Sequence, residues 1–299
     1  MSILVVGSIA FDSVETPFGK AEEVLGGSAS YFSIAASFFT DIQLVAVVGE
    51  DFPQEHLDLF RGRGVDLQGL QRLPGLTFRW KGKYSRDLNE RQTIGTCLNV
   101  FEDFRPQIPE QYRSSQYVFL ANIDPDLQLE VLKQVKAPKL TVGDTMNFWI
   151  EGKLNGVKKT LQAMDILTIN QEEAKQLSNE DNLVRAARKI SSLGPKTIII
   201  KRGEYGALMF TEGSIFSTPA FPLETVCDPT GAGDSFAGGF LGYLARAQEW
   251  DDKNLRKAII FGSVMASFCV EDFSLNRLKS LSYPEIEERF REFKELTNF

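Results

Sequence analysis

The sequence contains very little of the chemistry on which zinc sites, disulfide frameworks and histidine catalysis depend. Its three cysteines, Cys97, Cys227 and Cys269, lie far apart and form no CxxC pair, whereas disulfide frameworks and structural zinc sites need regularly spaced cysteines. We interpret them as ordinary buried or half-buried thiols. The single histidine, His56, is interpreted as part of an exposed helix start, and no second imidazole accompanies it. Catalysis by histidine is therefore not expected.

A long hydrophobic run and an excess of positive charge are also missing. No run of about 18 apolar residues occurs, and the first residues show no basic and apolar regions of a secretory signal. We therefore expect a cytoplasmic protein that does not bind membranes. The net charge is -7 and the pI is about 5.1, which argues against a broad basic surface and against a nucleic-acid partner. Any phosphate group must be held by a local site.

What the sequence does contain is an alternation of buried strands and helices. Its 299 residues are 43% hydrophobic and 24% charged, values typical of a globular chain. Continuous apolar runs predict strands at 3–6, 42–48, 117–121, 140–142, 166–169 and 197–201. Helical spacing predicts helices at 31–39, 127–135, 154–164, 172–177 and 183–193. This order predicts one α/β domain over residues 1–299, with a mostly parallel sheet covered by helices on both faces.

One segment departs from this alternation. Residues 77–84 and 93–100 alternate apolar with polar side chains, and a polar turn at 85–92 separates them. This is the pattern of a half-exposed hairpin. A strand with one face in water does not belong inside a doubly wound sheet. We therefore expect residues 76–104 to project from the main sheet as a flap or an oligomer contact.

The strongest signal for chemistry is the string DPTGAGDSFAGGF at residues 228–240. Apolar residues follow its glycines at helical spacing, so we expect a helix to begin within residues 231–234 with free amides pointing outward. A helix start of this kind binds anions. Asp234 stands beside those amides, where the helix end favours its ionised form and where it could accept a proton from a substrate hydroxyl. A simple helix cap is the structural alternative.

This string resembles the second sequence pattern of the ribokinase-like (PfkB) family of carbohydrate and nucleoside kinases, whose core is D-T/P-x-G-A-G-D. The resemblance implies that Asp234 is the catalytic base. It further implies an anion hole and a nearby monovalent-cation site, expected to take K⁺, with the residues Gly231, Ala232 and Gly233 for the first and Asp228 and Thr230 for the second. The implied fold is a ribokinase-like three-layer α/β/α sandwich with a mostly parallel central sheet and a small β-sheet lid.

Two features near the N-terminus are similar to the substrate site of this family. Gly26 and Gly27 precede an amphipathic helix, which alone would be a common turn, and they resemble the glycine pair that brings the backbone close to the sugar. Asp12 follows the first strand and resembles the aspartate that holds two substrate hydroxyls, although a solvated turn residue is the alternative. Many members have asparagine where this chain has Tyr31, whose ring could stack on a sugar or base or belong to the core.

The expected ATP site lies after two later strands. Asn170 and Glu173 are one helical turn apart, which a capping box explains equally well. The resemblance implies that this N-x-x-E pair organises Mg²⁺ and the nucleotide phosphates, and one carboxylate with retained waters suits Mg²⁺. The turn at 201–206 resembles the family's K-x-G-x-x-G turn, and residues 144–149 resemble a further family segment without its usual arginine. The implied ATP-binding residues are Asn170, Lys201, Gly203, Gly206 and Thr230, and Glu173 joins Asp228 and Thr230 as a metal-site residue.

Segments 12–25 and 76–104 resemble the family's β lid, which closes over the sugar and in many members pairs with another subunit. The resemblance implies a possible homodimer through the lid. It also makes Arg79, Trp80 and Tyr84 candidates for substrate or dimer contacts, against the alternative that they only cover the lid. Asn122, which follows the strand at 117–121, is also expected at the substrate site.

The leading functional hypothesis is an ATP-dependent kinase that transfers the γ-phosphoryl group to a hydroxymethyl group of a sugar. A nucleoside kinase is the alternative, because the ribose of a nucleoside presents the same group. A catalytically silent sugar-binding relative would lack the base or the open glycine loop, and neither defect is visible. A dinucleotide-dependent oxidoreductase and a P-loop kinase would need G-x-G-x-x-G and G-x-x-x-x-G-K-[ST], and the sequence shows neither at the required place.

Overall fold

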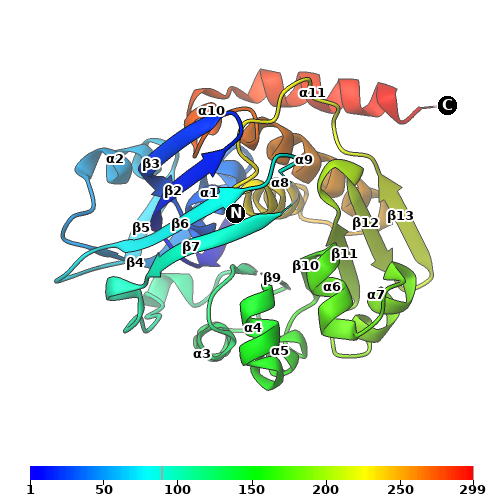
Figure 1. Cartoon of the computed structure of the whole chain (residues 1–299). Helices are drawn as coiled ribbons and strands as arrows, with labels where there is room; N and C mark the ends of the chain where they lie inside the picture. Colours follow the sequence, from blue (N-terminus) through cyan, green and yellow to red (C-terminus); the bar gives the residue numbers. More distant parts are fainter. Residues whose placement is uncertain (89, 299) are drawn as a thin grey trace.

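The body of the molecule is built on one nine-stranded sheet. The computed structural model describes residues 1–88 and 90–298. The strands are β1 Ser2–Val6, β4 Asp41–Gly49, β5 Val65–Leu73, β8 Tyr117–Leu120, β9 Leu140–Asp144, β10 Ile166–Asn170, β11 Thr197–Lys201, β12 Ala207–Thr211 and β13 Ser214–Thr218. Their order is β13-β12-β11-β10-β9-β8-β1-β4-β5, and Figure 1 shows β4 and β5 at one side of the body and β12 and β13 at the other. Only β12 and β13, at one edge, run antiparallel to their neighbours, so the prediction of a mostly parallel sheet is confirmed.

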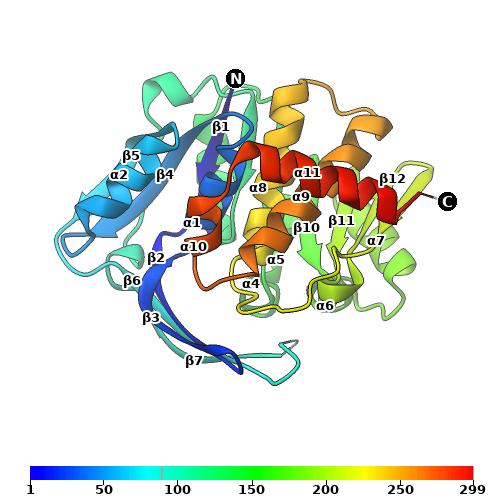
Figure 2. The same ribbon diagram turned by 90° about the horizontal axis from the view of Figure 1, so that it is seen from above.

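Helices cover both faces of this sheet, as Figure 2 shows from above. One layer contains α1 Ser28–Ala36, α2 Gln54–Gly62, α8 Ala232–Ala247, α9 Asp252–Cys269, α10 Asn276–Ser280 and α11 Tyr283–Leu296. The other contains α3 Pro125–Gln134, α4 Asn147–Gly152, α5 Leu154–Leu161, α6 Gln171–Ser178 and α7 Leu183–Ser191. The expected three-layer α/β/α architecture is therefore confirmed.

Alternation along the first strand shows how the sequence produces the two cores. Ile3 and Val5 point into the core under α1 and α8, whereas Leu4 and Val6 point into the core under α3 and α5. All four side chains are fully buried, because successive residues of a strand face opposite sides of the sheet. A strand buried on both sides must be apolar throughout, which is why the continuous apolar run at 3–6 predicted this position.

A second sheet of four strands forms the lid. Its strands are β2 Ala10–Thr16, β3 Gly19–Gly26, β6 Phe78–Tyr84 and β7 Arg91–Cys97, in the order β3-β2-β6-β7. Figure 2 shows it as a curved sheet that projects beyond the body. The prediction that the hairpin leaves the main sheet is confirmed. Residue 89, inside the predicted turn at 85–92, lies outside the described residues.

The two faces of the lid differ, and the strand register defines them. Asp12 pairs with Trp80, and Phe11 pairs with Arg79, so these pairs lie on opposite faces. The Tyr84 hydroxyl lies 3.1 Å from the Thr230 hydroxyl of the body. We call the face of Asp12, Trp80 and Tyr84 the inner face and that of Phe11 and Arg79 the outer face.

Helix α1 is joined directly to the end of β1. The Ser28 amide donates to the Ser8 hydroxyl at 3.1 Å, and the Ser8 amide donates to the Ser28 hydroxyl at 3.3 Å. The Ala29 amide donates to the Ser8 carbonyl at 3.0 Å. The first amides of a helix need acceptors from outside the helix, and Gly27, at the N-cap, has no side chain to accept them. Ser8 supplies these acceptors instead. The helix therefore begins at Ser28, earlier than the predicted 31.

An ion-pair cluster holds the segment that follows α9. Glu271 binds Arg277 at 2.9 Å and Arg289 at 2.7 Å. The neighbouring Val270 carbonyl accepts the amides of residues 227 and 228 at 2.8 and 3.4 Å. Because Arg289 belongs to α11, this helix braces the backbone that leads into the glycine-rich loop.

Three local expectations need correction. Strand β7 ends at Cys97, and a 3₁₀ turn at Asn99–Phe101 follows, so the second hairpin strand does not reach residue 100. Cys97 is exposed rather than half-buried. His56 is half-buried within α2, with its ring 5.4 Å from that of Phe52, because it packs under the base of the lid. Among the described residues, no helix has the length and apolar character to cross a membrane.

The turn at Gly27 provides a test of this arrangement. A Cβ atom at Gly27, where φ is +92°, would lie 2.5 Å from the Ser8 carbonyl oxygen, whereas nothing lies within 4 Å of one at Gly62. We expect Gly27→Ala to destabilise the protein by roughly 2 kcal/mol or more. Gly62→Ala, within a helix, should be neutral or stabilising by up to about 1 kcal/mol. Urea unfolding of both variants measures the difference, and equal stabilities would contradict the described turn.

Candidate active site

The candidate site lies at the carboxyl ends of the parallel strands. Asp144 ends β9, Asn170 ends β10 and Lys201 ends β11. Because these strands are parallel neighbours, their last residues lie side by side along the carboxyl edge of the sheet, the edge at which the parallel strands end. Proteins with α/β folds bind ligands at this edge. The structure thus brings together residues that are 57 positions apart in the sequence.

A buried ion pair stands at the centre of this edge. The Lys201 ammonium lies 2.8 Å from Asp144 Oδ2, and the two side chains are 16% and 7% exposed. Burial opposes the charge on Lys201, but the carboxylates of Asp144 and Glu173 outweigh it and raise the pKa of this lysine. Lys201 is therefore a fixed positive charge at the edge of the sheet.

The glycine-rich loop meets Lys201 from the opposite side. Gly231 has φ of +77° and directly precedes α8, which begins at Ala232. A Cβ atom at Gly233 would lie 3.0 Å from the Lys201 ammonium, so the helix start and this cation adjoin one another. The helix begins where the sequence predicted, and its positive end lies beside a lysine.

The expected anion hole has fewer free amides than the sequence indicated. The Ala232 amide donates to the Pro229 carbonyl at 3.2 Å and closes the turn. Within the described part of the chain, the amides of Gly231 and Gly233 have no acceptor. These two amides, rather than the three expected, are free to bind an anion.

Asp234 lies in the first turn of α8 and is half-buried. Burial raises the pKa of Asp234 to about 7; Asp144 adds to this rise, and Lys201 opposes it. The sequence predicted that the helix end alone would favour the ionised form, but desolvation is the larger effect here. The result is a carboxyl group able to gain or lose a proton near neutral pH.

Asn170 and Glu173 form a capping box at the start of α6. The Glu173 amide donates to Asn170 Oδ1 at 2.8 Å, and the Asn170 amide donates to Glu173 Oε2 at 3.1 Å. Burial and the nearby Asp144 raise the pKa of Glu173 to about 7. The box fixes the Glu173 carboxylate beside Asp144 and Lys201.

Asp228 and Thr230 lie behind the loop. Asp228 is 1% exposed, and one of its oxygens accepts the Thr230 amide at 2.9 Å. Its other oxygen is buried and has no partner among the described residues. Burial raises the pKa of Asp228. A buried carboxylate oxygen without a partner is costly, so this atom marks a place where a cation would stabilise the structure.

Asp12 lies on the inner face of the lid, 4% exposed. A Cβ atom at Gly26 would come within 1.9 Å of its carboxylate, which is why glycine is required there. Burial raises the pKa of Asp12 to about 7, although the Gly27 amide stabilises the ionised form. The structure therefore places Asp12, Gly26 and Gly27 together, as the sequence predicted.

The inner face of the lid adds a cation that sequence reasoning missed. Arg91 pairs with Tyr84 across the hairpin, and its guanidinium lies 5.4 Å from the centre of the Trp80 ring. The pKa values of Asp12, Glu173 and Asp234 are raised overall, and the positive charge of Arg91 makes each of these rises smaller. Arg91 therefore acts electrostatically on both the lid aspartate and the glycine-rich loop.

Other expected site residues lie elsewhere or are already engaged. Arg79 lies on the outer face of the lid, where it binds Glu23 at 2.7 Å and Asp51 at 2.9 Å, because strand alternation turns it away from Asp12. The amide side chain of Asn122 is taken up by Met146 and Trp149, each at 3.0 Å.

The two glycines of the turn after β11 have different surroundings. A Cβ atom at Gly206 would lie 2.0 Å from the Thr218 carbonyl oxygen, whereas Gly203 faces open space. Gly206 is therefore required by packing against β13. Gly203 alone leaves room beside the turn.

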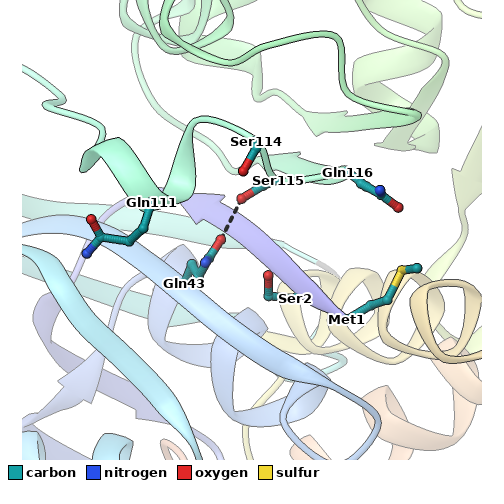
Figure 3. A pocket seen from close by; sticks show the side chains of 7 residues that line it. All are labelled: Met1, Ser2, Gln43, Gln111, Ser114, Ser115 and Gln116. Carbon is teal, nitrogen blue, oxygen red and sulfur yellow. Dashed lines mark hydrogen bonds between the residues drawn. The ribbon is translucent and has the colours of Figure 1, made fainter.

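Two hollows in the surface are not centred on these acids. One, about 200 Å³, lies at the amino ends of the parallel strands and has no charged side chain in its lining; Figure 3 shows its lining residues, among them Gln43, Ser115 and Gln116. The other, about 370 Å³, lies on the outer face of the lid and includes Phe11, His56 and Arg79. In the described residues, no three His, Cys, Asp or Glu side chains are close enough to hold a metal ion by themselves.

Comparison with known proteins identifies the family of this chain. Residues 2–280 match the pfkB family of carbohydrate kinases. A cytidine kinase from Thermococcus kodakarensis is 29% identical over 84% of this chain and 91% of its own length.

Solved structures share the fold at lower identity. A nucleoside kinase from Burkholderia thailandensis in complex with inosine has a TM-score of 0.77 at 19% identity, covering 97% of this chain and 96% of that one. An E. coli protein assigned as a ribokinase II, in complex with ATP and Mg²⁺, has a TM-score of 0.79 at 19% identity, covering 97% and 99%. Over nearly all of its length, then, the chain belongs to the pfkB family of carbohydrate kinases.

Proposed function

We propose that this kinase transfers the γ-phosphoryl group of ATP to the ribose hydroxymethyl group of a nucleoside. The observation that carries the proposal is the start of α8, where a carboxyl group with a pKa of about 7, Asp234, adjoins two free amides and the Lys201 ammonium. A proton acceptor beside a preorganised anion site is what phosphoryl transfer to an alcohol requires.

In the proposed reaction, the acceptor oxygen forms a bond to the γ-phosphorus while the bond between that phosphorus and the ADP oxygen breaks. Asp234 takes the proton that the acceptor hydroxyl loses. The amides of Gly231 and Gly233 and the Lys201 ammonium stabilise the negative charge of the transferring group. Asp12, on the inner face of the lid, holds ribose hydroxyls so that the hydroxymethyl group points to Asp234.

The residues present fit a bound Mg²⁺ and a bound monovalent cation. Glu173 and Asp144 crowd negative charge at the sheet edge, and this crowding helps to raise the pKa of Glu173 to about 7. Mg²⁺ takes one or two carboxylates together with waters and substrate phosphates, which suits this pair. When bound, Mg²⁺ supplies charge neutralisation at the ATP phosphates. The unpartnered oxygen of Asp228, with Thr230 beside it, fits K⁺.

The lid favours a nucleoside over a free sugar. Trp80 lies on the inner face next to Asp12, and its ring lies so flat over Gly82 that a Cβ atom there would meet it at 2.1 Å. The Arg91 guanidinium lies over this ring, so a flat base would stack on the indole in place of Arg91, and such stacking contributes about 1–3 kcal/mol per base. The similarity to a cytidine kinase and an inosine-bound nucleoside kinase supports this choice.

A free sugar, the leading hypothesis from sequence, is the second candidate, because Asp12 would hold its hydroxyls equally well. The lid also supports a homodimer. Among the described strands, β7 is the last of the lid sheet on one side and has no neighbour beyond it, and its Ile94 is 52% exposed. Exposed edge strands with apolar side chains pair readily with a second copy.

The function is tested with ATP, Mg²⁺ and an acceptor panel of cytidine, inosine, adenosine, ribose and fructose, in K⁺ and in Na⁺ buffers. We expect kcat/KM for at least one nucleoside to exceed that for ribose tenfold or more, with the product phosphorylated at the hydroxymethyl group by mass spectrometry. Higher kcat/KM with a free sugar would select the second candidate. No phosphorylation of any acceptor would overturn both.

Asp234→Asn is the control variant for this assay. It should reduce kcat by about a hundredfold or more, because general bases contribute about 10² to 10⁴, while binding of ATP by calorimetry stays intact. Equal rates in K⁺ and Na⁺ would remove the proposed role of Asp228 and Thr230.

Acidic pH should inactivate the enzyme through Asp234. Only the ionised carboxylate accepts a proton, and burial raises its pKa to about 7, so kcat/KM is expected to fall as pH decreases through about 7. Asp12 and Glu173 have pKa values of about 7 as well, so the fall should be steeper than one titration. A profile of kcat/KM that stays flat down to about pH 5 would contradict this.

Removing Lys201 should move that profile to higher pH. Lys201 lowers the pKa of Asp234, so Lys201→Met leaves the carboxyl group with a higher pKa, besides reducing activity. Lys196→Met is the control, because Lys196 is exposed and precedes the same strand. The inflection of kcat/KM with pH measures the effect, and an unchanged or lower inflection in Lys201→Met would be evidence against this coupling.

Arg91 should contribute to turnover from the lid. We expect Arg91→Met to reduce kcat/KM at least about tenfold, because a positioned cation near the transferring group stabilises its charge. Lys83→Met is the matched control: Lys83 is in the same sheet but binds Glu15 at 2.7 Å and lies one residue from Tyr84, on the outer face. Steady-state kinetics of both variants decide the point, and similar losses would assign the effect to lid stability.

A further inference from the structure

Tyr31 occupies a place that its expected role in substrate stacking does not explain. The side chain is 1% exposed. A Cβ atom at Gly231 would lie 2.3 to 2.4 Å from three atoms of the Tyr31 ring. The ring therefore lies directly beneath the backbone of Gly231, and no open face remains for a sugar or a base.

Gly231 is the residue whose placement matters most in the loop. Its φ of +77° lies in the left-handed region, and its amide is one of the two without an acceptor in the described chain. A glycine in this conformation has no side chain with which to fix itself. Something packed against its backbone must therefore determine where its amide points.

Tyr31 is itself held rigidly. It belongs to the first turn of α1, where its amide donates to the Gly27 carbonyl at 3.3 Å, and this turn is bonded to Ser8 at the end of β1. The preceding Gly26 accommodates the Asp12 carboxylate. The start of α1 thus contacts the lid aspartate through its glycines and the glycine-rich loop through the Tyr31 ring.

The hydroxyl group of Tyr31 does not account for its presence. It is buried and has no hydrogen-bond partner among the described residues. Burial and the carboxylates of Asp12 and Asp228 raise the pKa of this hydroxyl well above its ordinary value, so it remains neutral. A buried unpaired hydroxyl costs stability, whereas the ring makes the contact with Gly231.

We propose that Tyr31 is a positioning residue for the anion hole: its ring supports Gly231 from below and so fixes the Gly231 amide. It binds neither the sugar nor the base. This inference rests on the proposed role of the Gly231 amide in phosphoryl transfer. A displacement of about 1 Å at such a donor is enough to cost about a hundredfold in rate. The support should therefore affect turnover rather than substrate affinity.

The test compares three variants of the full chain. Tyr31→Leu removes the ring, and Tyr31→Phe keeps the ring but removes the hydroxyl. Phe32→Leu is the matched control, because Phe32 is the next residue in α1, is fully buried and stacks on Phe119 at 4.0 Å in the sheet. It reports what the loss of a buried ring in this helix does to stability alone.

Kinetics with the acceptor found for the wild type provide the first readout. We expect Tyr31→Leu to lower kcat about thirtyfold or more, with KM for ATP and for the acceptor changed less than about threefold. Tyr31→Phe should keep kcat within about threefold of the wild type and unfold at the same or a higher temperature. Phe32→Leu should lower the unfolding temperature as much as Tyr31→Leu and leave kcat within about threefold.

Binding of ADP with aluminium fluoride, which mimics the transferring phosphoryl group, provides the second readout. Tyr31→Leu should lose at least about tenfold in affinity for this complex while its affinity for ADP alone stays unchanged. Wild-type kcat in Tyr31→Leu, a rise in acceptor KM without a change in kcat, or equal losses in Tyr31→Phe and Tyr31→Leu would each overturn the proposal. A wild-type protein without kinase activity would instead overturn the proposed function, so the two failures are distinguishable.

Discussion

The ion pair between Lys201 and Asp144, 2.8 Å long and almost fully buried, is the contact on which the arrangement of the active edge depends. Two further carboxyl groups, those of Glu173 and Asp234, also act electrostatically on Lys201. Lys201 lowers the pKa values of these two groups, but burial and Asp144 outweigh it and raise both to about 7. The proposed phosphate site needs no broad basic surface on a chain of net charge -7, because one lysine, one lid arginine and a helix end supply positive charge locally.

Features that depend on a short stretch of sequence were predictable. The apolar run at 3–6 and the string at 228–240 each fix a local structure, so the buried strand and the start of α8 are found where expected. Features that depend on which face of a strand a side chain occupies could not be predicted from the sequence. Arg79 and Trp80 are adjacent in sequence, yet only the strand register places Trp80 beside Asp12 and turns Arg79 outward.

The same limitation explains why three further features were not predicted from the sequence: the place of Arg91 in the site, the raised pKa of Asp234 and the hydrogen bond of the Ala232 amide. The position of Arg91 opposite Tyr84 depends on where the hairpin turns and on an irregularity in its register. The pKa of Asp234 depends on burial by residues far away in the sequence. The Ala232 amide depends on a turn closed by Pro229. Composition and spacing carry information on which residues are present, but not on the solvent and contacts that the complete fold gives them.

The brace from α11 has a consequence for when the site acquires its shape. Arg289 is made after every strand of the two sheets and after the glycine-rich loop, and its bond to Glu271 steadies the neighbouring Val270, whose carbonyl accepts the amides of residues 227 and 228. The glycine-rich loop thus precedes α11 in the chain and gains this support only after α11 has been made. An emerging polypeptide can assemble the sheet and the lid first, and it completes the support of the glycine-rich loop only when α11 docks.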